Sequence, residues 1–158
     1  MSQSRGPVSS KRAGENAETA ILEVVDGLAY VPDDESEHID ARAETLIEPS
    51  RSLPFVGICL LEVGSSVEIK SAIPRLASGQ RGRFYLRREQ HQGLRDAGGS
   101  YLFAVCEPRP SREPVAMKIV PATVVDDAIT SWRSGGDDRP SCAQIAWSRI
   151  FDPSEVAP

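Results

Sequence analysis

The sequence feature that most limits the fold is an uninterrupted apolar run at Tyr101–Cys106. A strand with one exposed face alternates apolar and polar residues, whereas a continuous apolar run is typical of a central strand covered on both faces. A helical pattern over Leu86–Ala97 precedes the run and ends at Gly98-Gly99, in the position of a C-cap. A second strand pattern, Val115–Val120, follows it. We therefore expect a sheet with helices packed on both sides.

The remaining segments predict the order of the other elements. Apolar residues recur at helical spacing over Lys11–Leu28 and indicate an amphipathic helix. Phe55–Val63 and Val67–Lys70, which a Gly-Ser turn separates, are typical of a hairpin. Ala122–Thr130 indicates a short helix, and Cys142–Phe151 is apolar but of undecided type. The predicted order α-β-β-α-β-β-α gives an α/β fold with a mixed sheet flanked by helices.

Length and composition indicate one domain in a reducing compartment. A chain of 158 residues is long enough for a hydrophobic core. We expect a disordered tail at 1–10, a single domain at 11–151 and a flexible C-terminal tail at 152–158. No apolar run approaches the ~20 residues that cross a bilayer, and the start lacks the apolar core of a signal peptide. The three cysteines show no CxxC spacing. These observations predict a cytoplasmic protein with no membrane partner.

Charge is distributed unevenly in kind and in place. Three lysines stand against fifteen arginines and 23 acids. Such scarcity of lysine resembles the bias of salt-loving archaea, and a GC-rich genome would also produce much of it. Residues 70–95 hold seven bases and one acid. A nucleic-acid backbone could lie along this segment, and an arginine-rich, solvated loop and helix explains it equally well.

Glu68 and Lys70 carry the strongest chemical signal. Alternate residues of a strand point to the same face, so these two side chains should project together. A carboxylate binds a hard metal ion, and an ammonium beside it supports a nucleophile or developing charge at a phosphate. An isolated pair of this kind is more often an ordinary exposed strand face.

Four local sequences give this pair a context: Arg12–Glu18, Val56-Gly57-Ile58, Val67–Ser71, and Arg88-Glu89-Gln90 followed by the apolar strand. Together, over about residues 11–120, they resemble the PD-(D/E)xK nuclease superfamily, most closely its archaeal Holliday-junction-resolvase-like members. The resemblance implies a restriction-endonuclease-like α/β fold with an α-β-β-α-β core. It also implies Mg²⁺ or Mn²⁺ as cofactor, DNA as partner and a homodimer.

The resemblance also assigns roles to individual residues. Glu68 and Glu18 would bind the metal, Lys70 would act at the nucleophile, and Gln90 would fix the strand or orient a water. The residues expected to contact the DNA backbone are Arg81, Arg83, Arg87, His91 and Arg95, although a histidine such as His91 is more often an exposed helix residue without an assigned role.

The metal-binding aspartate of the family would fall at Gly57 or Ile58, and neither side chain can bind a metal. Glu48 could replace it as a ligand, or could be one solvated acid of an acidic stretch.

Three functions remain open from the sequence. The first is a metal-dependent DNA endonuclease, with selectivity for DNA structure left open. The second is a catalytically inactive module on the same fold that binds nucleic acid or a protein partner. The third is an interaction protein whose acids form a halophilic surface. Convergence of Glu18, Glu68 and Lys70 in space would favour the nuclease fold over the third reading.

Overall fold

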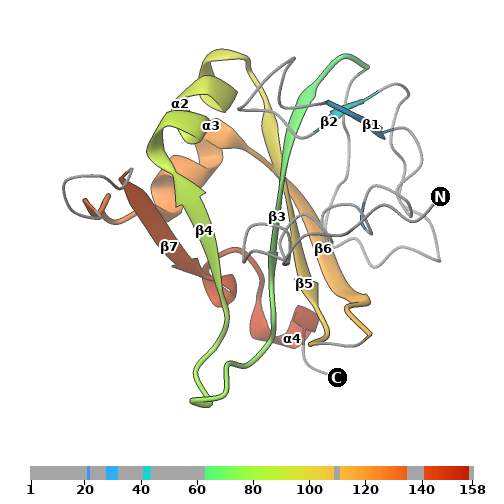
Figure 1. The fold of residues 1–158 in the computed structure, drawn as a ribbon, viewed down its shortest axis with the longest axis vertical. Coiled ribbons are helices and arrows are strands. Elements are labelled where there is room, and N and C mark those ends of the chain that lie inside the picture. The colour runs from blue at the N-terminus through green and yellow to red at the C-terminus, as the bar shows by residue number, and fades with distance from the viewer. Residues whose placement is uncertain are drawn as a thin grey trace, which may run out of the picture.

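A five-stranded mixed sheet forms the centre of the protein (Figure 1). The computed structural model describes residues 21, 28–31, 41–43, 63–108, 111–134 and 141–156. The strands of the sheet, in spatial order, are β1 (Leu28–Tyr30), β2 (Ala41–Ala43), β3 (Ser66–Ala72), β5 (Ser100–Cys106) and β6 (Pro114–Pro121). β3 and β5 run parallel, and the other neighbouring pairs are antiparallel.

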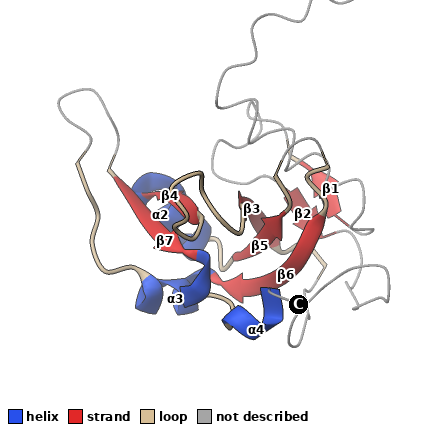
Figure 2. Ribbon diagram, turned by 90° about the horizontal axis from the view of Figure 1, so that it is seen from below, coloured by secondary structure: helices blue, strands red, loops and turns tan. Residues whose placement is uncertain are grey.

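A two-stranded antiparallel ribbon and short helices complete the described structure (Figure 2). The ribbon consists of β4 (Arg83–Arg87) and β7 (Cys142–Ala146). The helices are α2 (Arg88–Asp96), α3 (Ala122–Val125) and α4 (Pro153–Val156), with 3₁₀ turns at Asp126–Ala128 and Trp147–Arg149. In the described residues, no helix is long and apolar enough to span a membrane.

The central strand β5 divides the core into two layers. Tyr101, Phe103 and Val105 belong to the larger apolar cluster, which also takes residues from the ribbon, α2, α3 and α4. Leu102 and Ala104 point the other way into a smaller cluster. Both sets are almost fully buried. The apolar run therefore is a central strand covered on both faces, as the sequence predicted.

Helix α2 ends in the glycine cap that the sequence predicted. Gly98 has a φ of +66°, a left-handed conformation that costs glycine little. The Gly98 N–H donates to the carbonyl of Arg95 (2.9 Å), and the Gly99 N–H donates to that of Leu94 (2.8 Å). These two hydrogen bonds together form a Schellman motif. It turns the chain directly from α2 into β5.

Helix α2 begins at Arg88, two residues later than the sequence pattern indicated. Leu86 belongs to β4, where it lies two positions after Phe84 and points to the same face. Both side chains are fully buried on the inner face of the ribbon. The prediction was wrong here because a leucine at helical spacing also satisfies the two-residue period of a strand.

Segments near the C-terminus are more ordered than expected. The apolar element of undecided type divides into β7 and a 3₁₀ turn, and the predicted helix after Pro121 is shortened to α3 and a second 3₁₀ turn. Val156 in α4 is 6% exposed and packs in the larger cluster, within the stretch 152–158 for which the sequence predicts a flexible tail. The predicted helix at 11–28 and strand at 55–63 lie outside the described residues except at single positions.

Candidate active site

Strand β3 presents Glu68 and Lys70 on one face of the sheet, as the alternation predicted. The Lys70 Nζ lies 3.1 Å from the Glu68 Oε1, and the two side chains are 16% and 4% exposed. The pair is therefore not the ordinary exposed strand face considered as an alternative. A buried ion pair contributes little net stability because both charges lose their hydration, so stability alone does not explain its position. A pair of charges whose position stability does not explain makes this part of β3 a candidate functional site.

The neighbouring strand β5 places Tyr101 beside Glu68 and Phe103 beside Lys70. The Tyr101 hydroxyl lies 2.8 Å from the Nδ1 of His91 on α2. Burial raises the pKa of Tyr101, and the nearby charges of Glu68 and Asp126 raise it further. The phenol therefore keeps its proton at neutral pH and can donate it to His91.

His91 connects this tyrosine to the surface. Its Nε2 lies 2.5 Å from the Asp126 Oδ1, and the Arg95 guanidinium lies 3.1 Å from the other oxygen of Asp126. When Tyr101 donates to Nδ1, a neutral imidazole must carry its proton on Nε2, where the Asp126 carboxylate accepts it. The four groups form a continuous polar chain from the sheet beside Glu68 to the exposed end of Arg95.

The structure corrects the predicted basic stripe of α2. His91 is only 2% exposed and lies against the rings of Tyr101 and Trp132. Arg87 belongs to β4, and Arg95 pairs with Asp126. His91 therefore cannot reach a DNA backbone at the surface, because it is buried and its two ring nitrogens already bond Tyr101 and Asp126.

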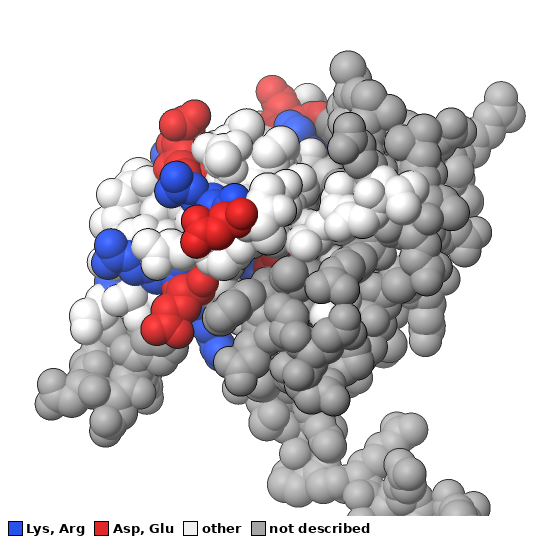
Figure 3. Space-filling model, turned by 90° about the horizontal axis from the view of Figure 1, so that it is seen from above, with Lys and Arg blue, Asp and Glu red and all other residues white. Residues whose placement is uncertain are grey.

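The other predicted backbone contacts are divided between two environments. Arg83 and Arg87 are exposed on β4. Arg81 is half-buried, and its guanidinium lies 5.3 Å from the ring centre of Trp147, a residue of the larger apolar cluster. Figure 3 shows acidic and basic side chains mixed on the face seen from above. The described residues therefore show no continuous basic patch on that face.

The remaining predicted site residues are only partly placed. Gln90 is half-buried on α2, the helix that carries His91. Glu18, Glu48, Gly57 and Ile58 lie outside the described residues. Within the described ranges, no three His, Cys, Asp or Glu side chains gather into a metal-sized cluster. The structure therefore brings together Glu68 and Lys70, and leaves the other predicted ligands as predictions.

The family model of a PD-(D/E)XK nuclease superfamily domain matches residues 3–152. The chain belongs to the PD-(D/E)XK nuclease superfamily. Its mixed sheet with flanking helices is the α/β fold that the sequence predicted for this superfamily. Membership supports a nuclease with a nucleic-acid substrate, and nucleases of this superfamily generally depend on divalent metal ions. Neither the curated proteins nor the solved structures contain a match to the chain.

Two residues of the polar chain that begins beside Glu68 were missed by sequence reasoning. Tyr101 was counted as part of an apolar run, although it carries the single hydroxyl of that run. Asp126 is 35 positions from His91, and no local spacing connects them. A hydroxyl inside a buried strand was the available signal, because a buried polar group needs a hydrogen-bond partner.

Proposed function

We propose that this chain is a metal-dependent endonuclease that hydrolyses phosphodiester bonds in DNA. The observation that carries the proposal is the Lys70–Glu68 pair on β3, 3.1 Å apart with Glu68 buried and Lys70 half-buried, in a chain of the PD-(D/E)XK superfamily. Glu68 would be a metal ligand, and Lys70 would act on the nucleophile or on the charge that develops at the phosphate.

The donor chemistry at this position fits a hard divalent ion. Mg²⁺ is usually bound through one or two carboxylates together with substrate phosphates and water. Glu68 supplies one such carboxylate, and the proposal assigns Glu18 and Glu48 as the further ligands. When bound, the ion would supply Lewis acidity to the phosphate and lower the pKa of a bound water.

The groups around the pair have supporting roles in this proposal. Lys70 holds one Glu68 oxygen at 3.1 Å, which fixes the direction of the carboxylate. Tyr101, His91 and Asp126 hold α2 against the sheet beside it. Gln90, on the same helix, would steady the strand or orient a water. Arg81, Arg83, Arg87 and Arg95 would contact the DNA backbone without reading sequence.

The proposal extends to a preference for branched DNA and to a homodimer, by resemblance to Holliday-junction resolvases. The test compares nicking of supercoiled plasmid, linear duplex and a four-way junction, with Mg²⁺, with Mn²⁺ and with EDTA, in low and in molar salt. Size-exclusion chromatography with light scattering reports the oligomeric state.

Three variants make this assay specific. Glu68→Gln and Lys70→Met should abolish metal-dependent cleavage while circular dichroism reports an unchanged fold. Lys118→Met is the matched control, because Lys118 lies on β6 of the same sheet and its Nζ bonds the Ile150 carbonyl (3.0 Å) instead of a carboxylate. The control should cleave like the wild type.

Cleavage that survives in Glu68→Gln would reveal a contaminating nuclease or a different site. Folded wild-type protein that binds DNA and cleaves none of these substrates would replace the proposal by its alternative, an inactive nuclease-fold module. Gly57 and Ile58 at the expected aspartate position favour that alternative.

A further inference from the structure

The outer face of the β4–β7 ribbon has an unusual composition. Three alternate residues of β4 point outward: Arg83, Tyr85 and Arg87. Their partners on β7 are Ala146, Gln144 and Cys142, so this face carries no acid. The inner face is apolar and fully buried, which fixes the direction of the outer residues. Tyr85 is 60% exposed, although a large aromatic side chain would usually be covered.

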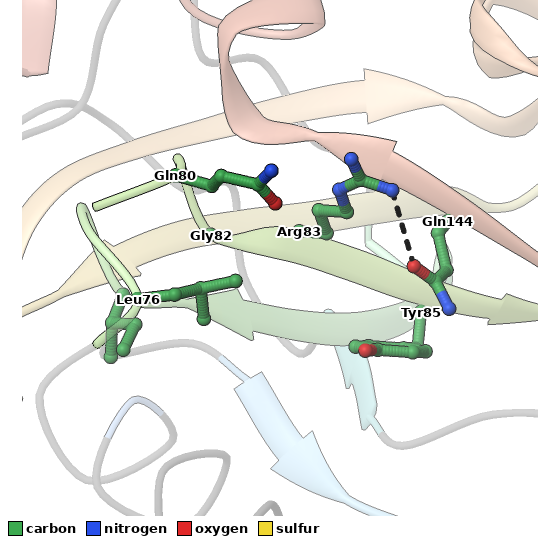
Figure 4. A pocket seen from close by; sticks show the side chains of 7 residues that line it. Leu76, Gln80, Gly82, Arg83, Tyr85 and Gln144 are labelled. Carbon is green, nitrogen blue, oxygen red and sulfur yellow. Dashed lines mark hydrogen bonds between the residues drawn. The ribbon is translucent and has the colours of Figure 1, made fainter. Parts of the chain in front are cut away.

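A small open pocket lies beside this face, between the ribbon and the 73–82 loop (Figure 4). Its volume is about 230 Å³, smaller than the ~300–1,000 Å³ typical of sites for drug-sized ligands. Leu76, 39% exposed, and Tyr85 provide its apolar walls. Gln80, Arg83 and Gln144 provide its polar edge. The size and lining suit one flat, heterocyclic group better than an extended ligand.

The polar edge is held in place by the ribbon. The Arg83 guanidinium donates to the Gln144 Oε1 across the strands at 3.4 Å, a long hydrogen bond (Figure 4). This contact directs the Gln144 amide group, whose N–H groups are donors. Next to the pocket, Gly82 packs so closely that a Cβ there would lie 1.9 Å from the Ile73 carbonyl oxygen. The pocket is therefore built on a tightly packed corner of the fold.

We propose that this pocket binds one unpaired base of a nucleic-acid strand, stacked on Tyr85, while Arg83 and Arg87 contact the adjoining phosphates. Exposed aromatic rings and nearby cations are the combination that binds single strands, because every base has a face for stacking and every linkage has a charge. Glutamine amides at the edge can pair with the donors and acceptors of a base. A face with two arginines and no acid complements a polyanion and not a peptide of mixed charge.

The position of the pocket connects it to the proposed active site. Ile73, which lines it, follows Lys70 by three residues at the end of β3, a distance of roughly 10 Å along an extended chain. The inference rests on the proposed function in taking nucleic acid as the substrate, and it deepens that function by specifying unpaired nucleotides next to the cleavage site.

The test measures binding without cleavage. Fluorescence anisotropy of a labelled single strand is recorded in EDTA at low salt, with the intact protein. A strand of the same length made of abasic nucleotides carries the same phosphates and no bases. The wild type should bind the natural strand roughly tenfold more tightly than the abasic strand, within the range of one stacked base.

Two substitutions at Tyr85 separate stacking from other effects. Tyr85→Phe keeps the ring and should bind like the wild type. Tyr85→Leu should bind the natural strand with roughly tenfold lower affinity than the wild type, and should bind the abasic strand with unchanged affinity. Equal affinity of the wild type for both strands, or unchanged binding by Tyr85→Leu, would overturn the inference. If binding depends on Tyr85 but the protein cleaves no substrate, the result would contradict the nuclease proposal and leave the inference about the pocket intact.

Discussion

At the scale of single residues, the site depends on polar groups that are buried and paired. Tyr101, His91 and Asp126 form two successive hydrogen bonds inside the molecule, 2.8 Å and 2.5 Å long. Buried polar groups stabilise a structure only when their partners are present, and each broken bond then costs more than it contributed. These three residues should therefore matter for the fold beside Glu68 as much as for any chemistry.

Tyr101→Phe tests this network directly. The substitution removes one oxygen and leaves the His91 Nδ1 without its hydroxyl donor, in a site where the imidazole is 2% exposed. We expect the free energy of unfolding to fall by about 1–3 kcal/mol, measured by urea denaturation. Tyr85→Phe is the matched control, because that ring is exposed, and it should change stability by less than about 0.5 kcal/mol. Equal effects of the two substitutions would contradict the network.

The same tyrosine should give the protein a pH dependence in the alkaline range. The pKa of Tyr101 is raised in the fold, so the folded state keeps a proton that the unfolded chain loses above its ordinary pKa of about 10. Its contribution to stability is present below that pKa and declines as the pH rises. Between pH 9 and 11, the wild type should lose stability more steeply than Tyr101→Phe. Parallel curves of stability against pH for the two proteins would show that folding does not raise the pKa of the Tyr101 hydroxyl.

At the scale of elements, the turn from α2 to β5 fixes the distance between the helix and β3, the strand that carries Glu68 and Lys70. A Cβ at Gly99 would lie 2.4 Å from the Leu94 side chain and 2.7 Å from the Ser66 carbonyl oxygen on β3. Backbone atoms of β3 cannot move aside as a flexible side chain could. The glycine therefore permits α2 to pack closely enough for His91 to reach Tyr101.

Substitution of the two adjacent glycines should separate conformational strain from close packing. In Gly98→Ala the new Cβ meets no atom within 4 Å, but the residue must adopt a φ of +66°. We therefore expect the free energy of unfolding to fall by about 1–2 kcal/mol. Gly99→Ala forces Leu94 and β3 apart. Its free energy of unfolding should fall by about 3 kcal/mol, the upper part of the range for overpacked cores. Thermal unfolding of both variants measures the difference. A smaller effect at Gly99 than at Gly98 would show that the helix can shift without cost.

Element by element, the sequence predicted what local pattern determines. The apolar run of β5, the alternation of β3 and the glycines after α2 each carry their structure in neighbouring residues. β4 was not predicted, because Arg83–Arg87 is only five residues long and its Leu86 also fits a helical spacing. β7 is equally short, and the pairing of β4 with β7 joins segments about sixty residues apart. No local period reports such a pairing.

The candidate site divides in the same way. Glu68 and Lys70 were predictable because strand alternation alone puts them on one face. The burial of His91 was not, since its partners come from β5 and from the turn after α3. A histidine between two arginines of the sequence indicates an exposed basic stripe until the tertiary contacts are known. The predicted ligands Glu18 and Glu48 stay predictions.

At the scale of the whole molecule, charge sets the conditions under which nucleic acid can bind. The chain has a net charge of −5, so its overall field repels a polyanion. Attraction must come from local groups, and the outer face of the ribbon offers Arg83 and Arg87 without an acid. Binding then depends on few phosphate contacts, and its dependence on salt concentration scales with their number.

The dependence on salt can be predicted from the number of these contacts. Each phosphate neutralised on a single strand contributes about −0.7 to the slope of log K against log salt concentration. If Arg81, Arg83 and Arg87 each neutralise one phosphate, the slope should be about −2, and Arg87→Gln should reduce it by about 0.7. Anisotropy titrations of the single strand between 50 and roughly 300 mM salt give both slopes. Glu89→Gln, one exposed acid removed from the start of α2, is the control and should leave the slope unchanged, because it neutralises no phosphate. A slope near zero, or one that Arg87→Gln leaves unaltered, would place the nucleic-acid interface on another part of the molecule.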